Sequence, residues 1–158
     1  MKVLVVEDSA VVRERVVARV RDIARVELVA ETTDVAGALD ALDSVAPDLV
    51  ILDLNLPGKS GMELLPILKS RVAPPVVVVL TNETSDECGR RCIELGADYF
   101  FDKSKQFQMA LDVVEVASGR LGNDAQRVGE NLTASTDERP TMRSGSRRQT
   151  PSRKMRKP

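Results

Sequence analysis

Short apolar runs alternate with amphipathic segments along the first 120 residues of the chain. The apolar runs are KVLVVE, VELVAE, LVILD, PVVVVLT and YFFD, at residues 2–7, 26–31, 49–53, 75–81 and 99–102. Both odd and even positions are apolar in these runs, which is typical of strands buried on both faces of a parallel sheet. The intervening segments space their apolar residues as helices do, which predicts helices over about 9–25, 34–45, 60–71, 85–95 and 106–118.

The predicted helix ends carry suitable residues. Ser9 and Asp34 stand where N-caps are expected, and Gly96 follows the fourth helix, where a C′ glycine is common. Pro66 lies inside the third helix and is expected to kink or shorten it. Five strand–helix pairs predict an α/β fold, a doubly wound five-stranded parallel sheet with five helices covering both faces.

Polar residues stand where the predicted strands end. Glu7 and Asp8 end the first strand, Asp53 ends the third, Thr81 ends the fourth, and Lys103 follows the fifth. Ligands of such sheets bind beyond the carboxyl ends of the strands. We therefore expect three carboxylates, a hydroxyl and an ammonium group at one edge of the sheet.

Three carboxylates at one edge repel one another, by about 4 kcal/mol for a pair about 4 Å apart at an effective dielectric constant of about 20. Lys103 offsets part of this repulsion, and an oxygen-only ligand set suits Mg²⁺ as the remaining counter-charge. A carboxylate beside Mg²⁺ and lysine can attack a phosphoryl group and become an aspartyl phosphate. The plainer alternatives are that Asp53 caps the following turn, and that Glu7 and Asp8 favour a helix N-terminus.

The segments VLVVEDS, LVILDLNLPGKSG, VVVLT and GADYFFDKS together resemble the receiver domain of two-component response regulators. The resemblance covers about residues 1–120 and rests on the joint order and spacing of the four segments. It implies a flavodoxin-like sheet of strand order 2-1-3-4-5. The predicted domain organisation is therefore a receiver domain over 1–120 and a tail over 121–158.

The resemblance also implies roles for individual residues. The metal would be bound by Glu7, Asp8, Asp53 and the backbone carbonyl of Asn55. The phosphoacceptor would be Asp53, and the phosphoryl group would be bound by Thr81 and Lys103. The switch residues would be Thr81 and Phe100. Asn55, Asn82 and Glu83 flank the path of the water that would hydrolyse the phosphoryl group. Two positions depart from the family pattern, Asn82 where a small residue is usual and Ser104 where proline usually follows the lysine.

Composition narrows the chemistry. The chain has no histidine, which excludes histidine-dependent nucleophiles and histidine-ligated metals. Its two cysteines, Cys88 and Cys92, are one helical turn apart, as expected of packed thiols in a reducing cytoplasm. No apolar run approaches the length of a membrane span, so neither a membrane nor a signal segment is predicted.

Charge divides the chain at about residue 120. Residues 1–120 carry 14 basic and 20 acidic side chains, whereas residues 121–158 carry 9 basic and 4 acidic ones. The second part has little apolar content and no periodicity, so we predict a basic, disordered tail. Its net charge of +5 supports only weak, salt-sensitive nucleic-acid binding, which makes nucleic acid an unlikely partner.

The leading functional hypothesis is a stand-alone receiver that accepts a phosphoryl group on Asp53 with Mg²⁺. The donor would be a histidine kinase or a phosphotransfer protein, and the output would be contact with an unknown downstream protein. One alternative is a Mg²⁺-dependent phosphohydrolase with an aspartyl-phosphate intermediate, although Asn55 stands where such enzymes often carry a second carboxylate. Another is a nucleic-acid-associated protein that acts through the basic tail.

Overall fold

A five-stranded parallel sheet forms the centre of the computed structural model, which describes the backbone of residues 1–133 and the side chains of residues 1–121. Its strands are β1 Lys2–Val6, β2 Leu28–Thr32, β3 Leu49–Leu52, β4 Val76–Thr81 and β5 Tyr99–Asp102. They pair in the order β2-β1-β3-β4-β5, all in parallel. The predicted flavodoxin-like α/β fold is confirmed.

Helices follow each strand at the predicted places. They are α1 Ala10–Arg21, α2 Val35–Val45, the 3-10 helix η1 Gly61–Glu63, α3 Leu64–Lys69, α4 Asp86–Glu94 and α5 Phe107–Thr133. The Asp34 side chain caps α2 by accepting from the Gly37 amide at 2.7 Å, and Ser85 caps α4 by accepting from the Cys88 amide at 3.2 Å. Ser9 precedes α1 without a side-chain cap, and its backbone amide donates to Glu7 Oε1 at 3.0 Å.

The third helix is shortened, as Pro66 predicted. Its first turn is the separate 3-10 helix η1, and α3 ends at Lys69, two residues before the predicted end. Pro66 occupies the first turn of α3. A missing amide hydrogen costs little there, because the first amides of a helix have no intrahelical acceptor.

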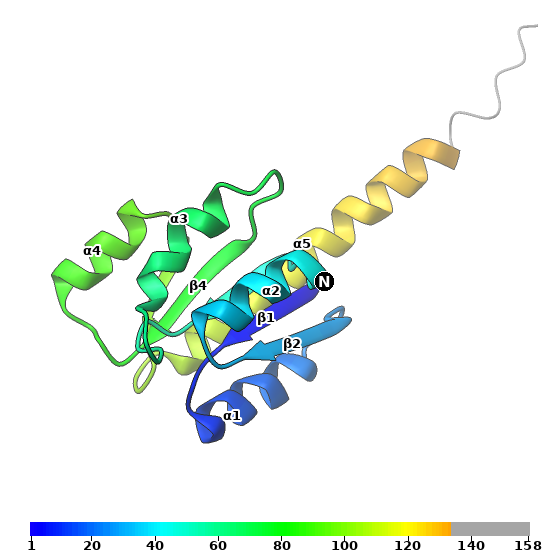
Figure 1. The fold of residues 1–158 in the computed structure, drawn as a ribbon. Helices are drawn as coiled ribbons and strands as arrows, with labels where there is room; N and C mark the ends of the chain where they lie inside the picture. The colour runs from blue at the N-terminus through cyan, green and yellow to red at the C-terminus, as the bar shows by residue number, and fades with distance from the viewer. Residues whose placement is uncertain (134–158) are drawn as a thin grey trace, which may run out of the picture.

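The predicted end of the last helix near Ser118 is wrong. Helix α5 continues to Thr133 and projects beyond the rest of the fold, as Figure 1 shows. Gly119 directly follows that predicted end, but a glycine inside a helix costs only about 1 kcal/mol relative to alanine. Residues 121–133 of the predicted tail are therefore helical, and the remainder of that prediction, on residues 134–158, lies outside the described residues.

Two apolar cores lie on opposite faces of the sheet. Side chains of α2, α3 and α4 pack on one face, against alternate strand residues such as Leu4, Leu52 and Val79. Helices α1 and α5 pack on the other, against residues such as Val5 and Ile51. The central strands β1, β3 and β4 are thus buried on both sides, which is why both odd and even positions along them are apolar apart from Lys2 and Thr81 at their ends.

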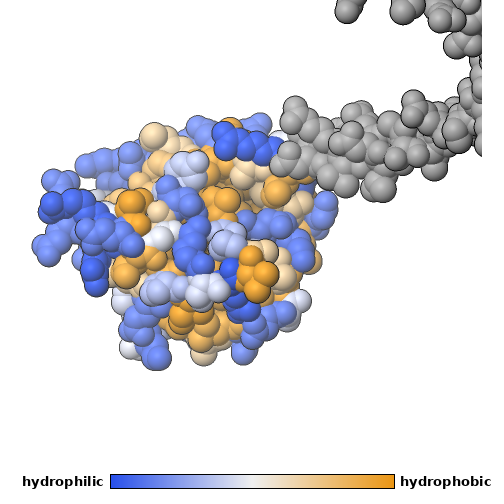
Figure 2. Space-filling view, turned by 90° about the horizontal axis from the view of Figure 1, so that it is seen from above, coloured by the Kyte–Doolittle hydropathy of each residue, from blue (hydrophilic) through white to orange (hydrophobic). Residues whose placement is uncertain are grey.

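The surface mixes polar and apolar residues. Figure 2 shows hydrophobic patches set among hydrophilic residues on one face of the molecule. An apolar hollow lies at the amino-terminal ends of β4 and β5, lined by Val76, Tyr99, Val113 and Leu121 among others. Within the described part of the chain, no helix has the length and apolarity needed to cross a membrane.

Candidate functional site

Strand pairing brings the sequence-predicted residues to one edge of the sheet. The ladder continues just past the strands, because the Asp53 amide donates to the Val6 carbonyl at 3.0 Å and the Lys103 amide donates to the Thr81 carbonyl at 2.9 Å. Residues that follow adjacent strands are therefore held side by side. Glu7 and Asp53 leave neighbouring strands, and Lys103 arrives from the far edge strand.

Lys103 bridges two buried carboxylates. Its Nζ lies 2.6 Å from Glu7 Oε2 and 2.9 Å from Asp53 Oδ2. The side chains are almost inaccessible, with 10% of Lys103, 5% of Glu7 and 4% of Asp53 exposed. Buried charges of this kind need partners, and each of the three has one.

The protonation of the cluster follows from burial and pairing. Burial raises the pKa of Glu7, and the hydrogen bond and charge of Lys103 only partly oppose that rise. Burial alone would lower the pKa of Lys103, but its hydrogen bonds to Glu7 and Asp53 outweigh burial, so its pKa is raised. Lys103 therefore carries a full charge at neutral pH, while the nearby carboxylates exceed it in number.

Three carboxylates face a common point. One oxygen each from Glu7, Asp8 and Asp53 lies within 4.8 Å of the others, and Asp8 is the exposed member. The ligand atoms are all oxygens, and one ammonium group balances only one of the three negative charges. This donor set and its charge excess fit a hard divalent cation such as Mg²⁺.

Arg13 is a residue of the site region that the sequence reasoning missed. From the first turns of α1, its Nη1 donates to the backbone carbonyls of Glu7 at 3.0 Å and Asp8 at 3.3 Å, while its Nε pairs with Glu31 at 3.1 Å. The guanidinium group thus holds the loop that carries the acidic pair. Its position four residues after the N-cap Ser9 was the available signal, because that spacing returns the side chain to the start of the helix.

Gly61 lies against the backbone of Asp53. A Cβ built at this position would lie 2.1 Å from the Asp53 carbonyl oxygen, a distance that no side chain tolerates. The Gly61 amide donates to the Leu54 carbonyl at 2.9 Å. The loop after β3 therefore closes tightly beneath Asp53, and a glycine is required for that closure.

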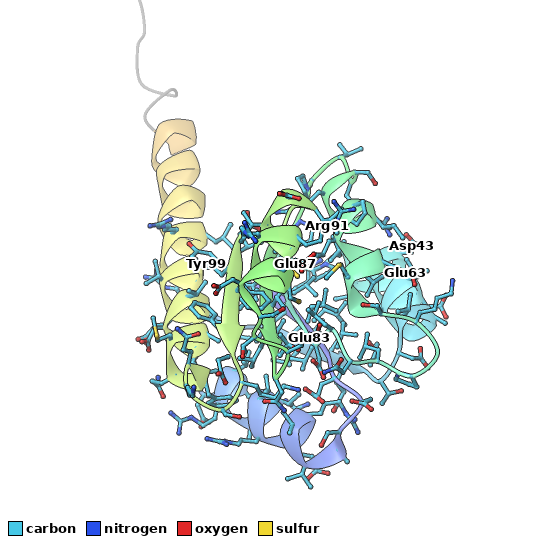
Figure 3. The ribbon with its side chains drawn as sticks, turned by 90° about the vertical axis from the view of Figure 1, so that its left-hand side faces the viewer. Asp43, Glu63, Glu83, Glu87, Arg91 and Tyr99 are labelled. Carbon is cyan, nitrogen blue, oxygen red and sulfur yellow. The ribbon has the colours of Figure 1, made fainter. Side chains whose placement is uncertain are left out.

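The other predicted residues lie around this centre. Asn55 is exposed, and its amide donates to Asp53 Oδ1 at 3.3 Å. Thr81 is completely buried, and its Oγ1 accepts from the Glu83 amide at 3.2 Å. The hydroxyl is thus engaged with the loop that follows β4. Glu83 itself is exposed on that loop, and Figure 3 shows it below Glu87 and Arg91 of α4.

Phe100 is partly buried on the α4 side of the sheet. It packs against the core that contains Cys88 and Cys92. A Cβ built on Gly89 would lie 3.4 Å from the Phe100 ring, so the ring rests directly against the middle of α4. Thr84, Gly89 and Phe100 line a shallow hollow.

The two cysteines are buried and do not form a disulfide, as predicted for packed thiols. Burial raises the pKa of Cys92 to about 12, and it raises the pKa of Cys88 as well. Both remain protonated at neutral pH and pack as small apolar groups.

Asn82 and Ser104, the two departures from the family pattern, contact each other. The Ser104 hydroxyl donates to Asn82 Oδ1 at 3.1 Å. No sequence pattern predicts this bond, because it joins two exposed side chains on different loops. The fold and these contacts define a flavodoxin-like α/β domain with a lysine-paired acidic site beyond its strand ends.

Comparison with known proteins assigns the family. The sequence model of the response regulator receiver domain matches residues 3–115. The chain therefore belongs to the response regulator receiver domain family, which controls signalling by phosphorylation in two-component systems.

Individual relatives agree with this assignment. The chain is 34% identical over 121 residues to the DNA-binding transcriptional activator DevR/DosR of Mycobacterium tuberculosis, a match over 76% of this chain and 56% of that protein. The chain spans about half the length of such curated relatives.

Solved structures show the same fold. The BeF3-activated N-terminal receiver domain of Klebsiella pneumoniae RstA is 27% identical with a TM-score of 0.65, over 75% of this chain and 98% of that one. The Mn(2+)-bound form of the response regulator Rcp1 is also 27% identical, with a TM-score of 0.59, over 72% of this chain and 88% of that one.

Proposed function

We propose that Asp53 accepts a phosphoryl group from a histidine kinase or phosphotransfer protein. The observation that carries this proposal is the buried Asp53 carboxylate, bound by Lys103 at 2.9 Å and grouped with Glu7 and Asp8. An Asp53 carboxylate oxygen forms the new bond to phosphorus. The bond from phosphorus to the donor breaks, and its electron pair leaves with the donor nitrogen or oxygen.

Mg²⁺ is the proposed cofactor. Glu7, Asp8 and Asp53 would hold it, with the backbone carbonyl of Asn55 as a further ligand. The ion would supply positive charge to the oxygens of the transferring phosphoryl group. The negative excess at the site and the all-oxygen donor set support this assignment. The Mn(2+)-bound state of the related Rcp1 supports it further.

Lys103 and Thr81 are proposed to bind the phosphoryl oxygens. The Lys103 ammonium group already donates to Asp53 Oδ2, so a small movement would let it bind an oxygen of the added phosphoryl group. We propose that the Thr81 hydroxyl, which now accepts from the Glu83 amide, turns away from it and donates to a phosphoryl oxygen. We propose that this exchange, together with movement of Phe100 against α4, shifts the population toward the signalling state.

The proposed output surface is the face of α4, β5 and α5, which would contact a downstream protein. This assignment follows the resemblance to the family, and the packing of Phe100 against Gly89 gives the switch residue direct access to α4. The chain acts as a phosphoacceptor in a cytoplasmic signalling pathway. The proposed partners are proteins, and nucleic acid is not among them.

The phosphorylated state is proposed to be short-lived, with a lifetime of minutes or less. Asn55 and Glu83 are exposed polar residues beside the site, and Glu83 can orient an attacking water. Asn82 narrows the same entrance from the loop after β4. We give the polar pair more weight, because a loop side chain can rotate away whereas a missing water-orienting group cannot be replaced.

Intact-mass spectrometry tests the proposal. The wild-type protein, incubated with Mg²⁺ and acetyl phosphate, should gain the mass of one phosphoryl group, and hydroxylamine should remove it because acyl phosphates are labile. Asp53→Asn should gain nothing. Asp102→Asn is a matched control, since Asp102 precedes Lys103 but lies outside the acidic cluster. A mass gain that persists in Asp53→Asn would contradict the assignment.

A further inference from the structure

The loops after β4 and β5 are joined by one side-chain hydrogen bond. Ser104 Oγ donates to Asn82 Oδ1 at 3.1 Å. Ser104 directly follows Lys103, and Asn82 directly follows Thr81. The bond therefore links the chain neighbours of the two side chains that are proposed to bind the phosphoryl group.

The loop after β5 is the fixed partner of this pair. Asp102 Oδ1 accepts from the amides of Ser104 at 2.7 Å and Lys105 at 3.1 Å, which closes an Asx turn around Lys103. The Gln106 side chain accepts from the Asp102 amide at 2.9 Å. Ser104 is thus held in place by its own loop, and its hydroxyl can anchor a more mobile partner.

The loop after β4 is the partner that has to move. Residues 82–85 are all exposed, and the Thr81 hydroxyl is turned toward the Glu83 amide at 3.2 Å. We expect the hydroxyl to leave that amide when it turns toward Asp53. Asn82 lies between Thr81 and Glu83 in the chain, so it moves with this peptide and strains or breaks its bond to Ser104.

We propose that Ser104 is a positioning residue that, through Asn82, holds the 82–85 loop in its unphosphorylated arrangement and slows phosphoryl uptake by Asp53. The inference rests on the proposed phosphoacceptor function and adds a control element to it. Because the bond belongs to the unphosphorylated arrangement, its loss increases the fraction of molecules ready to react. The proposal has this bond broken in the phosphorylated arrangement, so loss of Ser104 leaves the decay of the phosphoprotein unchanged.

The test compares rates of phosphoryl gain with acetyl phosphate and Mg²⁺ by intact-mass spectrometry. Ser104→Ala and Asn82→Ala should each accelerate uptake about two- to tenfold, the effect of losing one ordinary hydrogen bond. The double variant should be no faster than the faster single variant, because both changes remove the same bond. Ser104→Thr keeps a hydroxyl group and should restore the wild-type rate.

Two controls separate positioning from general loosening. Thr84→Ala alters the same loop at a side chain with no hydrogen bond among the described residues, and it should react at the wild-type rate. Purified phosphorylated Ser104→Ala should lose its phosphoryl group as fast as wild type, and melting temperatures establish that each variant is folded. If Ser104→Ala does not fold, Asn82→Ala and Thr84→Ala decide the question.

Wild-type uptake rates in both single variants would overturn the inference, as would full additivity in the double variant or equal acceleration by Thr84→Ala. A changed decay rate in Ser104→Ala would also overturn it. These outcomes leave the phosphoacceptor role intact provided that wild type gains the phosphoryl group and Asp53→Asn does not. If wild type gains no mass, the proposed function fails and this inference fails with it.

Discussion

Replacing Lys103 with methionine should strongly destabilise the metal-free protein at neutral pH. The substitution keeps an unbranched side chain, one atom shorter, and removes its charge, which leaves Glu7 and Asp53 buried beside each other without a counter-charge. Their side chains are only 5% and 4% exposed, so solvent cannot replace the lost partner. Removing one partner of a buried ion pair costs about 3–5 kcal/mol, and we expect a loss of this size.

The loss should depend on pH in a defined direction. Burial already raises the pKa of Glu7, and Lys103 is the main group that opposes this rise. Without Lys103 the folded-state pKa rises further above the unfolded value. The destabilisation is therefore complete above the folded pKa, and it shrinks as pH falls through that pKa toward the unfolded value of 4.5, because protonation removes the buried charge.

Urea unfolding followed by far-UV circular dichroism measures this effect, since the chain has no tryptophan and a single tyrosine. Wild type, Lys103→Met and the exposed neighbour control Lys105→Met should be compared in EDTA at about pH 7.5 and about pH 5. Lys105→Met should match wild type. The reasoning is refuted if Lys103→Met is as stable as wild type at the higher pH, or if its deficit grows as pH falls.

Four further outcomes are expected. Mg²⁺ at roughly 100 times its dissociation constant should stabilise the wild-type protein by about 2.7 kcal/mol, measured as a rise in melting temperature. A melting temperature that does not change with Mg²⁺ would count against the metal site. Gly61→Ala should cost roughly 3 kcal/mol in urea unfolding, because its Cβ would meet the Asp53 carbonyl at 2.1 Å; near-wild-type stability would show that the loop yields freely. Glu83→Leu should lengthen the phosphoprotein lifetime, measured as the decay of added mass, and an unchanged decay would remove Glu83 from the hydrolytic path. Cys92 should react with a thiol reagent only on unfolding, since it is buried with a pKa of about 12; rapid labelling of the native protein would contradict this.

The fold could be predicted because its signals are local and repeated. The strands are short, largely apolar runs, and caps such as Asp34 mark where helices begin. The gathering of Glu7, Asp53 and Lys103 could also be predicted, since parallel strands end at a common edge. These features depend on pattern and topology, which a single sequence contains.

Other features depend on energies that a pattern does not express. The end of α5 was predicted too early because glycine weakens a helix without forbidding it. The Arg13 contacts with the Glu7 and Asp8 carbonyls depend on which way one long side chain turns. The Ser104–Asn82 bond depends on how two loops meet. The closeness of Gly61 to Asp53 follows from packing in three dimensions.

The bond between Lys103 and Glu7 joins residues that are 96 positions apart in the chain. During synthesis the acidic residues leave the ribosome long before the lysine that neutralises them, because β5 is the last strand to be made. A nascent chain that ends before β5 has three carboxylates and no ammonium group at that edge. Under the proposed phosphoacceptor role, a chain would therefore become competent to receive a phosphoryl group only once β5 and Lys103 have been made.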